Sequence, residues 1–335
     1  GTGNTLRADA AMARRLIIES LTHFLEIYDV DGFRFDLAEL IDLPVLGLIE
    51  EALQEVKPGV ILIAEPWSFR GHIGRDLRHT GWSAWNDGYR DFIARYVKGQ
   101  GNYDGIQYFI NGSLGWLTTA PAQTVNYLSS HDDRCWLDKI TENPEHNGYD
   151  PTDRDIARTH LAIGILLTSL GIPMLHQGAD FLASKHGKNN TYQDGDENAL
   201  DYHRIDRFRA THEWVKALIQ FRLSEVGAPL RPRHTPGDGY ARFWSADDDG
   251  ASAIAAWWNI DQSAGAHQVL VGYNPNPETP RRIHLGGLDA RDWRPIADRH
   301  TVNLKGLEGS KLDANEPALT LDPLGFALFT RKAPS

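Results

Sequence analysis

Cysteine is nearly absent from this sequence, and it has neither a long apolar run nor an excess of positive charge. Cys135 is the one cysteine in 335 residues, so no disulfide and no thiolate metal cluster can form within the chain. The longest apolar run, residues 161–170, is shorter than the roughly 18 residues that cross a bilayer. The formal net charge of −11 argues against a nucleic acid or an anionic membrane as partner, because phosphate binding needs a basic face. A neutral ligand suits this charge better, and the counts leave the cellular compartment open.

The composition is that of an ordinary globular protein, with 41% hydrophobic and 24% charged residues. Apolar periodicity predicts an alternation of helices and buried strands over the first two thirds of the chain. Helices are predicted at 10–28, 44–56, 89–98, 153–169 and 211–223, and strands at 32–37, 60–64, 124–128 and 171–175. Such alternation is typical of parallel βα units.

The pattern of predicted helices and strands changes near residue 231. Short strands are predicted at 240–244, 252–258, 267–273 and 327–330, separated by turn clusters such as the one at 247–250. This pattern predicts an antiparallel β-sandwich. We therefore expect two domains, with residues 1–228 in the parallel βα part and residues 229–335 in a C-terminal β-sandwich.

Polar residues follow the predicted parallel strands at the point where each strand ends. Asp36 ends the first strand and Glu65 follows the second, while His131-Asp132 and His176 follow the other two. The C-terminal ends of parallel barrel strands meet at one rim, where such barrels carry their active sites. A single strand-terminal carboxylate more often caps the next helix, and Asp133 fits that role.

Arg34 resists such a structural explanation. Strand alternation places Arg34 on the same face as Asp36. A guanidinium cannot be neutralised by losing its proton, so a buried one must be paired. The sequence therefore predicts that Arg34 holds Asp36 ionised and oriented.

Several segments resemble a known enzyme family. DGFRFDLA, IAEPW and NYLSSHDD resemble three sequence blocks of the alpha-amylase family of glycoside hydrolases. The opening GTGNTL and the segment WNDGYRDFIARYVKG at 85–99 resemble its debranching members, the type I pullulanases and isoamylases. The blocks occur in the family's order over residues 1–225.

The resemblance implies roles for three carboxylates. It makes Asp36 the nucleophile, Glu65 the general acid/base, and Asp132 the carboxylate that holds sugar hydroxyls as the ring distorts. It assigns substrate binding to Arg34, His131, Trp67, Asn189 and Asn190. A retaining glycosidase needs two carboxyl groups about 5–5.5 Å apart, which neighbouring strand ends can supply. Burial near other carboxylates is expected to raise the pKa of Glu65, so that it holds a proton near neutral pH.

The family resemblance also implies a fold, a partial (β/α)8 TIM barrel of about strands four to eight, followed by an antiparallel β-sandwich domain. In that numbering 32–37 is the fourth strand and 171–175 the eighth, while the sixth lies between residues 85 and 124, where no pattern places it. The first three strands have no counterpart here. We expect them on the same or another chain, and we expect little or no hydrolase activity from this chain alone.

The expected ligand is an α-glucan polysaccharide or oligosaccharide, and the leading hypothesis is hydrolysis of its α-1,6 branch bonds. An α-1,4-acting amylase of the same family is the nearest alternative. A non-catalytic glucan-binding half-barrel is another. A metal-dependent hydrolase with Asp36, Glu65, His131 and Asp132 as ligands is the third, and Arg34 speaks against it, because it puts a cation beside the supposed metal. No cofactor is required, and nothing in the sequence indicates a structural Ca²⁺.

Overall fold

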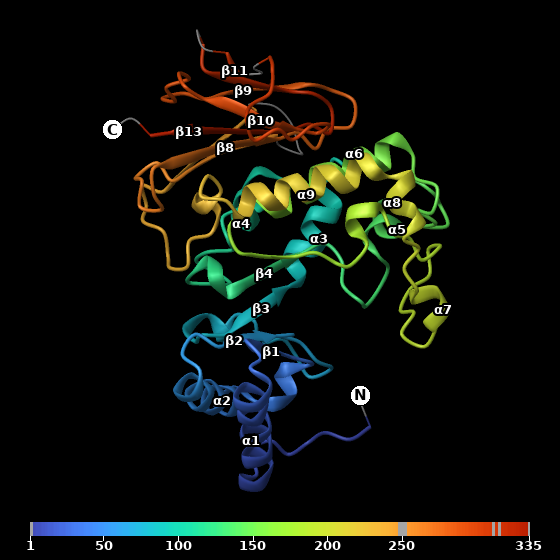
Figure 1. Cartoon of the computed structure of the whole chain (residues 1–335), viewed down its shortest axis with the longest axis vertical. Helices are drawn as coiled ribbons and strands as arrows, with labels where there is room; N and C mark the ends of the chain where they lie inside the picture. Colours follow the sequence, from blue (N-terminus) through green and yellow to red (C-terminus); the bar gives the residue numbers. More distant parts are fainter. Residues whose placement is uncertain (1–2, 247–252, 310–311, 314–315, 334–335) are drawn as a thin grey trace. The chain divides into compact units, whose positions relative to one another are not determined.

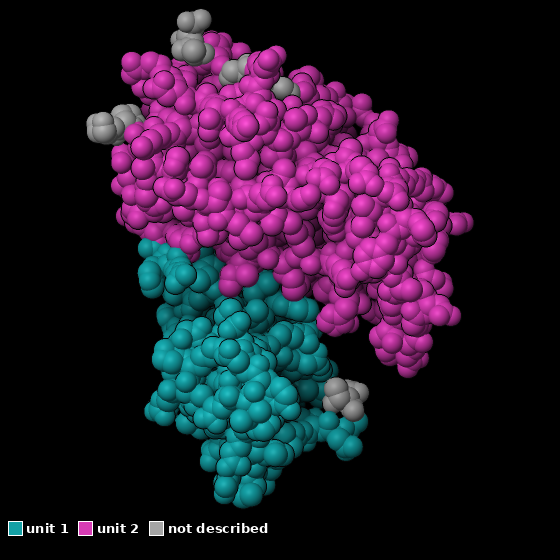
Figure 2. All heavy atoms as spheres, in the orientation of Figure 1, with its two compact units in different colours: residues 1–86, 112–125, 233–235 teal, residues 87–111, 126–232, 236–335 magenta. Residues whose placement is uncertain are grey.

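The computed structural model describes residues 3–246, 253–309, 312–313 and 316–333. The first two residues of GTGNTL, the predicted turn at 247–250 and the first residue of the strand predicted at 252–258 lie outside the described part. The chain folds into two compact units, shown in different colours in Figure 2. Unit 1 contains residues 1–86, 112–125 and 233–235, and unit 2 contains residues 87–111, 126–232 and 236–335.

Unit 1 is built from strand–helix alternation (Figure 1). Its elements are α1 (Ala11–Tyr28), β1 (Gly32–Phe35), α2 (Leu43–Val56), β2 (Ile61–Ala64) and β3 (Ser83–Asn86), with 3-10 turns η1 (Ala38–Ile41), η2 (Asp76–His79) and η3 (Pro121–Gln123). β1 pairs in parallel with β2, and β2 with β3. A Cβ at Gly32 would lie 2.1 Å from the Ile61 carbonyl oxygen, so this pairing requires glycine.

β1 is unusually exposed for a parallel strand. None of its four residues is buried, whereas all four residues of β3 are. The neighbouring helix α1 has a second apolar stripe, formed by Met12, Leu16 and Ile27, which are exposed while Leu25 is buried against the unit. Parallel strands are normally covered on both faces, and a helix that is apolar on two sides is normally buried on both.

β3 corrects the sequence analysis, which found no strand between the second and third predicted ones and placed the missing one between residues 85 and 124. The strand begins just before that interval and is polar at both ends. Ser83 Oγ donates to the Ala122 carbonyl oxygen over 2.6 Å. Asn86 Nδ2 donates to Ser113 Oγ and Thr124 Oγ1, each at 2.9 Å. These hydrogen bonds satisfy buried polar groups that an apolar pattern cannot detect.

Unit 2 combines helices with short strands and two antiparallel sheets. Its helices are α3 (Asp87–Tyr96), α4 (Tyr103–Ile110), α5 (Trp136–Ile140), α6 (Asp153–Thr168), α7 (Gly195–Asn198), α8 (His203–Arg207) and α9 (Arg209–Leu223), with η4 (Ala179–Phe181) and η5 (Ala228–Leu230). β4 (Thr124–Tyr127) enters the unit and β5 (Ile172–Met174) follows α6. Of these helices, α4, α5, α7 and α8 were not predicted from the sequence.

The two antiparallel sheets come from the last third of the chain, as predicted. One has the order β10-β13-β8-β7-β6 and the other β11-β12-β9. Their strands are β6 (Ala241–Ser245), β7 (Ile254–Trp258), β8 (His267–Tyr273), β9 (Arg281–His284), β10 (Arg294–Asp298), β11 (Leu312–Asp313), β12 (Ala318–Leu321) and β13 (Phe326–Lys332). An apolar cluster with members such as Leu270, Leu319 and Phe329 is drawn from both sheets.

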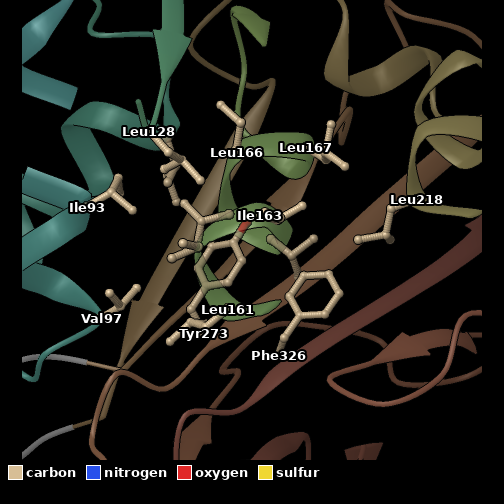
Figure 3. Close-up of a cluster of buried hydrophobic side chains, with 14 of the residues drawn as sticks. Ile93, Val97, Leu128, Leu161, Ile163, Leu166, Leu167, Leu218, Tyr273 and Phe326 are labelled. Carbon is tan, nitrogen blue, oxygen red and sulfur yellow. The ribbon is translucent and has the colours of Figure 1, made fainter. Parts of the chain in front are cut away.

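The main core of unit 2 joins its helices to the larger sheet. Figure 3 shows side chains of α6, among them Leu161 and Ile163, gathered with Tyr273 of β8 and Phe326 of β13 in one apolar cluster. Burial of each such side chain contributes about 1.5–3 kcal/mol. This core also includes residues that adjoin the loops after β4 and β5, such as Trp136 and Leu182. None of the helices in the described ranges is long and apolar enough to cross a membrane.

Candidate active site

Arg34, Asp36 and Glu65 converge at the ends of β1 and β2. Arg34 Nη1 donates to Asp36 Oδ1 over 2.7 Å, and Arg34 Nη2 lies 3.1 Å from Glu65 Oε2. One guanidinium therefore contacts both carboxylates, Asp36 through Nη1 and Glu65 through Nη2. The register of β1 and β2 explains this, because Phe35 pairs with Ala64 and each carboxylate comes one residue later.

The two carboxylates differ sharply in environment. The Glu65 side chain is 4% exposed, whereas that of Asp36 is 71% exposed. Glu65 Oε2 also accepts a hydrogen bond from the Leu37 backbone N–H at 2.8 Å. Its main chain is fixed as well, since the Glu65 N–H donates to the Phe35 carbonyl oxygen and the Ala38 N–H to the Glu65 carbonyl oxygen. Glu65 is thus held in place, while Asp36 faces solvent.

Aromatic rings line this group on one side. The Arg34 guanidinium lies 4.4 Å from the centre of the Trp85 ring, a cation–π contact. The half-buried Trp67 lies 6.4 Å from Trp85 and 6.1 Å from His72, measured between ring centres. Trp67 is therefore close to Trp85, which contacts Arg34, and its role in substrate binding stays a prediction.

Four other aromatic residues in or near the segments that follow the strands fall into two groups. Trp82, Tyr89 and Trp136 are core residues with almost no exposed surface. Phe69 lies at the exposed tip of the loop after β2.

His131 and Asp132 lie in unit 2, in a bend that follows β4. His131 Nε2 is 3.4 Å from Asp132 Oδ2, and the Asp132 N–H donates to Ser130 Oγ over 3.3 Å. β4 ends at Tyr127, so these residues lie beyond the strand and not within it. Both side chains are at least half exposed.

Asp133 connects this bend to two other segments. Arg90 of α3 pairs with Asp91 and also reaches toward Asp133, with Nη1 3.6 Å from Asp133 Oδ2. The Asp133 N–H donates to Asn190 Oδ1 over 2.8 Å, and the Asn190 N–H donates back to the Asp133 carbonyl oxygen. The bend is therefore held from both sides. Asn189 is exposed, and its role stays a prediction.

Sequence reasoning missed the contribution of Arg90. It lies inside the segment WNDGYRDFIARYVKG, but only the fold brings it to Asp133, 43 positions further along the chain. The Arg90 guanidinium forms an ion pair with the Asp91 carboxylate. The pKa of Asp91 is lowered, because hydrogen bonds from Arg90 and Lys139 outweigh the burial that opposes ionisation. The ion pair between Lys139 Nζ and Asp91 Oδ1, at 3.0 Å, links α5 to α3.

A cavity of about 510 Å³ lies in unit 2 beside His131. Its walls include His176, Gln177, Lys185 and Arg204. Burial, reinforced by the nearby Lys185 and His131, lowers the pKa of His176 to about 4. His176 is therefore neutral near pH 7, and its Nδ1 lies 3.4 Å from Ser129 Oγ. The wall thus combines this neutral imidazole with charged side chains of both signs, among them Lys185 and Glu197.

The metal hypothesis finds no donor arrangement among the residues that the structure describes. No group of three or more His, Cys, Asp or Glu side chains in those residues is placed to hold an ion. Asp36 and Glu65 are two of the four ligands in that hypothesis. Both contact the Arg34 guanidinium, which is a cation in its own right.

The residues predicted from the sequence divide between the units. Arg34, Asp36, Glu65 and Trp67 meet in unit 1, whereas His131, Asp132, Asn189 and Asn190 belong to unit 2. Within unit 1, the arrangement offers one exposed and one buried carboxylate joined through a shared cation. This geometry can supply a nucleophile and a proton-transfer group to one bond.

Comparison with known proteins identifies relatives with this architecture. No family model matches the sequence. The chain is 30% identical over 256 residues to a pullulanase of Bacillus subtilis, a match that covers 69% of this chain and 35% of that protein. It is 30% identical to a glycogen debranching enzyme of Pectobacterium atrosepticum, covering 81% and 46%. An isoamylase of a Flavobacterium species also matches, at 28% identity.

A solved structure agrees with the fold. Pullulanase from Bacillus acidopullulyticus superimposes with a TM-score of 0.84 at 22% identity, over 97% of this chain and 41% of that one. This likeness establishes the fold of parallel and antiparallel sheets. The chain spans 34% to 46% of the length of the curated relatives it matches.

Proposed function

The chain is related to the pullulanase- and isoamylase-type debranching enzymes of the alpha-amylase family, and we propose that it carries the catalytic carboxylates of a retaining α-glucan hydrolase. The proposed reaction is hydrolysis of α-1,6-glucosidic bonds in starch, glycogen or pullulan. The ligand is a neutral glucan, in keeping with the formal net charge of −11.

The observation that carries the proposal is the shared guanidinium of Arg34. It brings Asp36 and Glu65 to a common point although they lie 29 positions apart in the chain. Retaining glycosidases require such closeness, because one carboxylate attacks the anomeric carbon while the other protonates the leaving oxygen. The exposed Asp36 suits attack on a bound sugar, and the buried Glu65 suits a group shielded from bulk water.

The proposed mechanism has two steps. Asp36 attacks the anomeric carbon and forms a glycosyl ester, while Glu65 gives its proton to the departing glycosidic oxygen. Glu65 then takes a proton from water, which attacks the same carbon and releases Asp36. Asp132 and His131 bind hydroxyl groups of the distorted sugar, and Trp67, Asn189 and Asn190 contact neighbouring glucosyl units.

The architecture proposed for the whole protein follows the family. β1 would be the fourth strand of a (β/α)8 barrel and β5 the eighth, with residues 1–228 in the barrel and residues 229–335 in a C-terminal β-sandwich domain. The first three strands would come from the same or another chain and would cover β1. The exposure of β1 and of the second apolar stripe of α1 supports the proposal that these strands cover unit 1.

The test is the activity of the longest polypeptide that the gene encodes, on pullulan and on amylose. We expect hydrolysis of pullulan, and we expect the Asp36→Asn variant to lose at least about a thousandfold in rate, because the nucleophile is gone. Hydrolysis of amylose alone would replace the α-1,6 assignment with an α-1,4 one. Activity on neither glucan, with the protein folded, would contradict the proposal.

A further inference from the structure

Trp116 stands apart from the other tryptophans of the chain. All ten lie in the described residues, and nine are buried or half-buried. Trp116 is 58% exposed. An indole ring this exposed leaves much apolar surface in water, which a folded protein normally avoids.

The backbone around Trp116 is held rigidly. Residues 113–118 form a tight turn in which the Gly115 N–H donates to the Thr118 carbonyl oxygen over 3.0 Å. Gly115 has φ +88°, a left-handed conformation that favours glycine. Thr118 Oγ1 donates to the Gly112 carbonyl oxygen over 2.7 Å, and the Leu117 side chain is buried. The turn therefore points Leu117 inward and presents Trp116 to solvent with little freedom to lose on binding.

A charged hydrogen-bond donor, the Arg75 guanidinium, lies beside this ring. The Arg75 guanidinium carbon lies 5.4 Å from the centre of the Trp116 ring, and Arg75 is exposed. The flanking Gly115 and Thr119 are exposed as well. A single flat ring with donors beside it differs from a protein–protein hot spot, which sits inside a wider apolar patch.

The turn also contacts the loop that follows Glu65. A Cβ at Gly74 would lie 2.6 Å from His72 Cε1 and 3.4 Å from Leu117 Cδ1, so the two loops meet closely at this glycine. His72 in turn forms a β-bridge with Trp67. The turn that carries Trp116 is thus connected to Trp67 through the loop that contains His72 and Gly74.

We propose that Trp116 and Arg75 form an additional α-glucan-binding platform in unit 1. The exposed indole face stacks on the C–H face of a glucosyl unit, and Arg75 donates hydrogen bonds to its hydroxyl groups. The choice of glucan as ligand rests on the proposed function, whereas the platform itself rests on the exposure and rigidity of Trp116.

The test is affinity electrophoresis of the full chain in native gels containing soluble starch. Trp116→Ala should weaken retardation by starch about tenfold, the loss expected for one stacking contact. Trp116→Phe keeps a flat ring and should retain part of the binding. Tyr28→Ala, which removes an exposed aromatic ring on α1, is the matched control and should bind like the wild type. Circular dichroism and thermal unfolding check that each variant is folded.

The outcomes separate this proposal from the proposed function. Starch retardation that persists unchanged in Trp116→Ala would overturn the platform and leave the proposed reaction standing. A wild-type chain that starch does not retard at all would also overturn the platform. If Trp116→Ala weakens starch binding while the full-length protein shows no hydrolysis, the platform holds and the proposed reaction fails.

Discussion

Arg34 Nη2 lies 3.1 Å from Glu65 Oε2, and through this contact a largely buried carboxylate depends on a cation from the neighbouring strand. Glu65 is 4% exposed and Arg34 is 27% exposed. The same guanidinium holds Asp36, so one side chain organises both members of the proposed catalytic pair.

Replacing Arg34 with Met should destabilise unit 1 by about 2 kcal/mol, because Glu65 then remains buried without its cation. The estimate is below the cost of breaking a fully buried pair, since Arg34 is partly solvated. Urea unfolding measures the change. The double variant Arg34→Met with Glu65→Gln also removes the buried carboxylate and should recover most of the loss. No difference between the single and double variants would contradict the coupling.

Arg222 should be a stability determinant of unit 2. Its guanidinium donates to four backbone carbonyl oxygens, those of Leu167 at 2.8 Å, Ser169 at 2.9 Å, Gly171 at 2.7 Å and Leu230 at 3.1 Å. Burial lowers its pKa to about 10, so it stays charged at neutral pH. Arg222→Met should cost at least about 3 kcal/mol by leaving these carbonyls without donors.

The matched control for Arg222 is Arg209→Met. Arg209 lies on the same helix but is exposed, and its ion pair is with the exposed Asp206. This change should alter the free energy of unfolding by less than about 0.5 kcal/mol. Equal losses in the two variants would show that burial of the guanidinium does not matter.

His160 should make unit 2 less stable as the pH falls below about 6.5. Its Nδ1 lies 2.8 Å from the Arg299 carbonyl oxygen, its Nε2 lies 2.9 Å from Thr211 Oγ1, and its ring stacks on Trp214. Burial lowers its pKa to about 4. Between pH 6.5 and pH 4 the unfolded chain therefore binds a proton that the folded chain does not, so stability decreases as the pH is lowered through this window.

The loss of stability at low pH can be calculated from the lowered pKa of His160. Lowering the pH from 7 to 4.5 should cost about 2 kcal/mol through His160 alone. His160→Gln removes this titration, so its unfolding free energy should change less between the two pH values than that of the wild type. An identical pH dependence in wild type and variant would contradict the assignment.

The chain by itself should self-associate. The open edge of β1 and the apolar stripe of Met12, Leu16 and Ile27 on α1 are typical features of a surface that another segment covers. Placing charges on the stripe, with Leu16→Glu and Ile27→Lys, should raise the monomer fraction in sedimentation velocity. A wild-type chain that is monomeric at high concentration would contradict this prediction.

Apolar periodicity predicted much of the fold. The helices over α1, α2, α6 and α9 were located to within two residues, because each contains apolar residues over a length typical of helices. β2 and β8 were found because each contains a short apolar run, ILIA in β2 and VLV in β8. β3 escaped, because Ser83 and Asn86 are buried through hydrogen bonds to distant residues, and these partners are set by the fold.

The site was predicted unevenly for a related reason. Strand ends and family motifs pointed to Asp36 and Glu65, and alternation assigned Arg34 to Asp36. The contact of Arg34 with Glu65 depends on the register between β1 and β2, which the pattern of one strand cannot specify. Trp116 was overlooked because the sequence does not distinguish an exposed tryptophan from a buried one.

Covalent trapping of a glycosyl ester is the sharpest test of whether Asp36 and Glu65 act on one glycosidic bond. A fluorinated α-glucosyl fluoride that slows ester breakdown is incubated with the full-length gene product, and the digested peptides are weighed by mass spectrometry. We predict one added fluoroglucosyl group on the peptide that contains Asp36, accumulating more slowly in Glu65→Gln. A label on a different acidic residue, or turnover that inverts the anomeric configuration, would contradict the account.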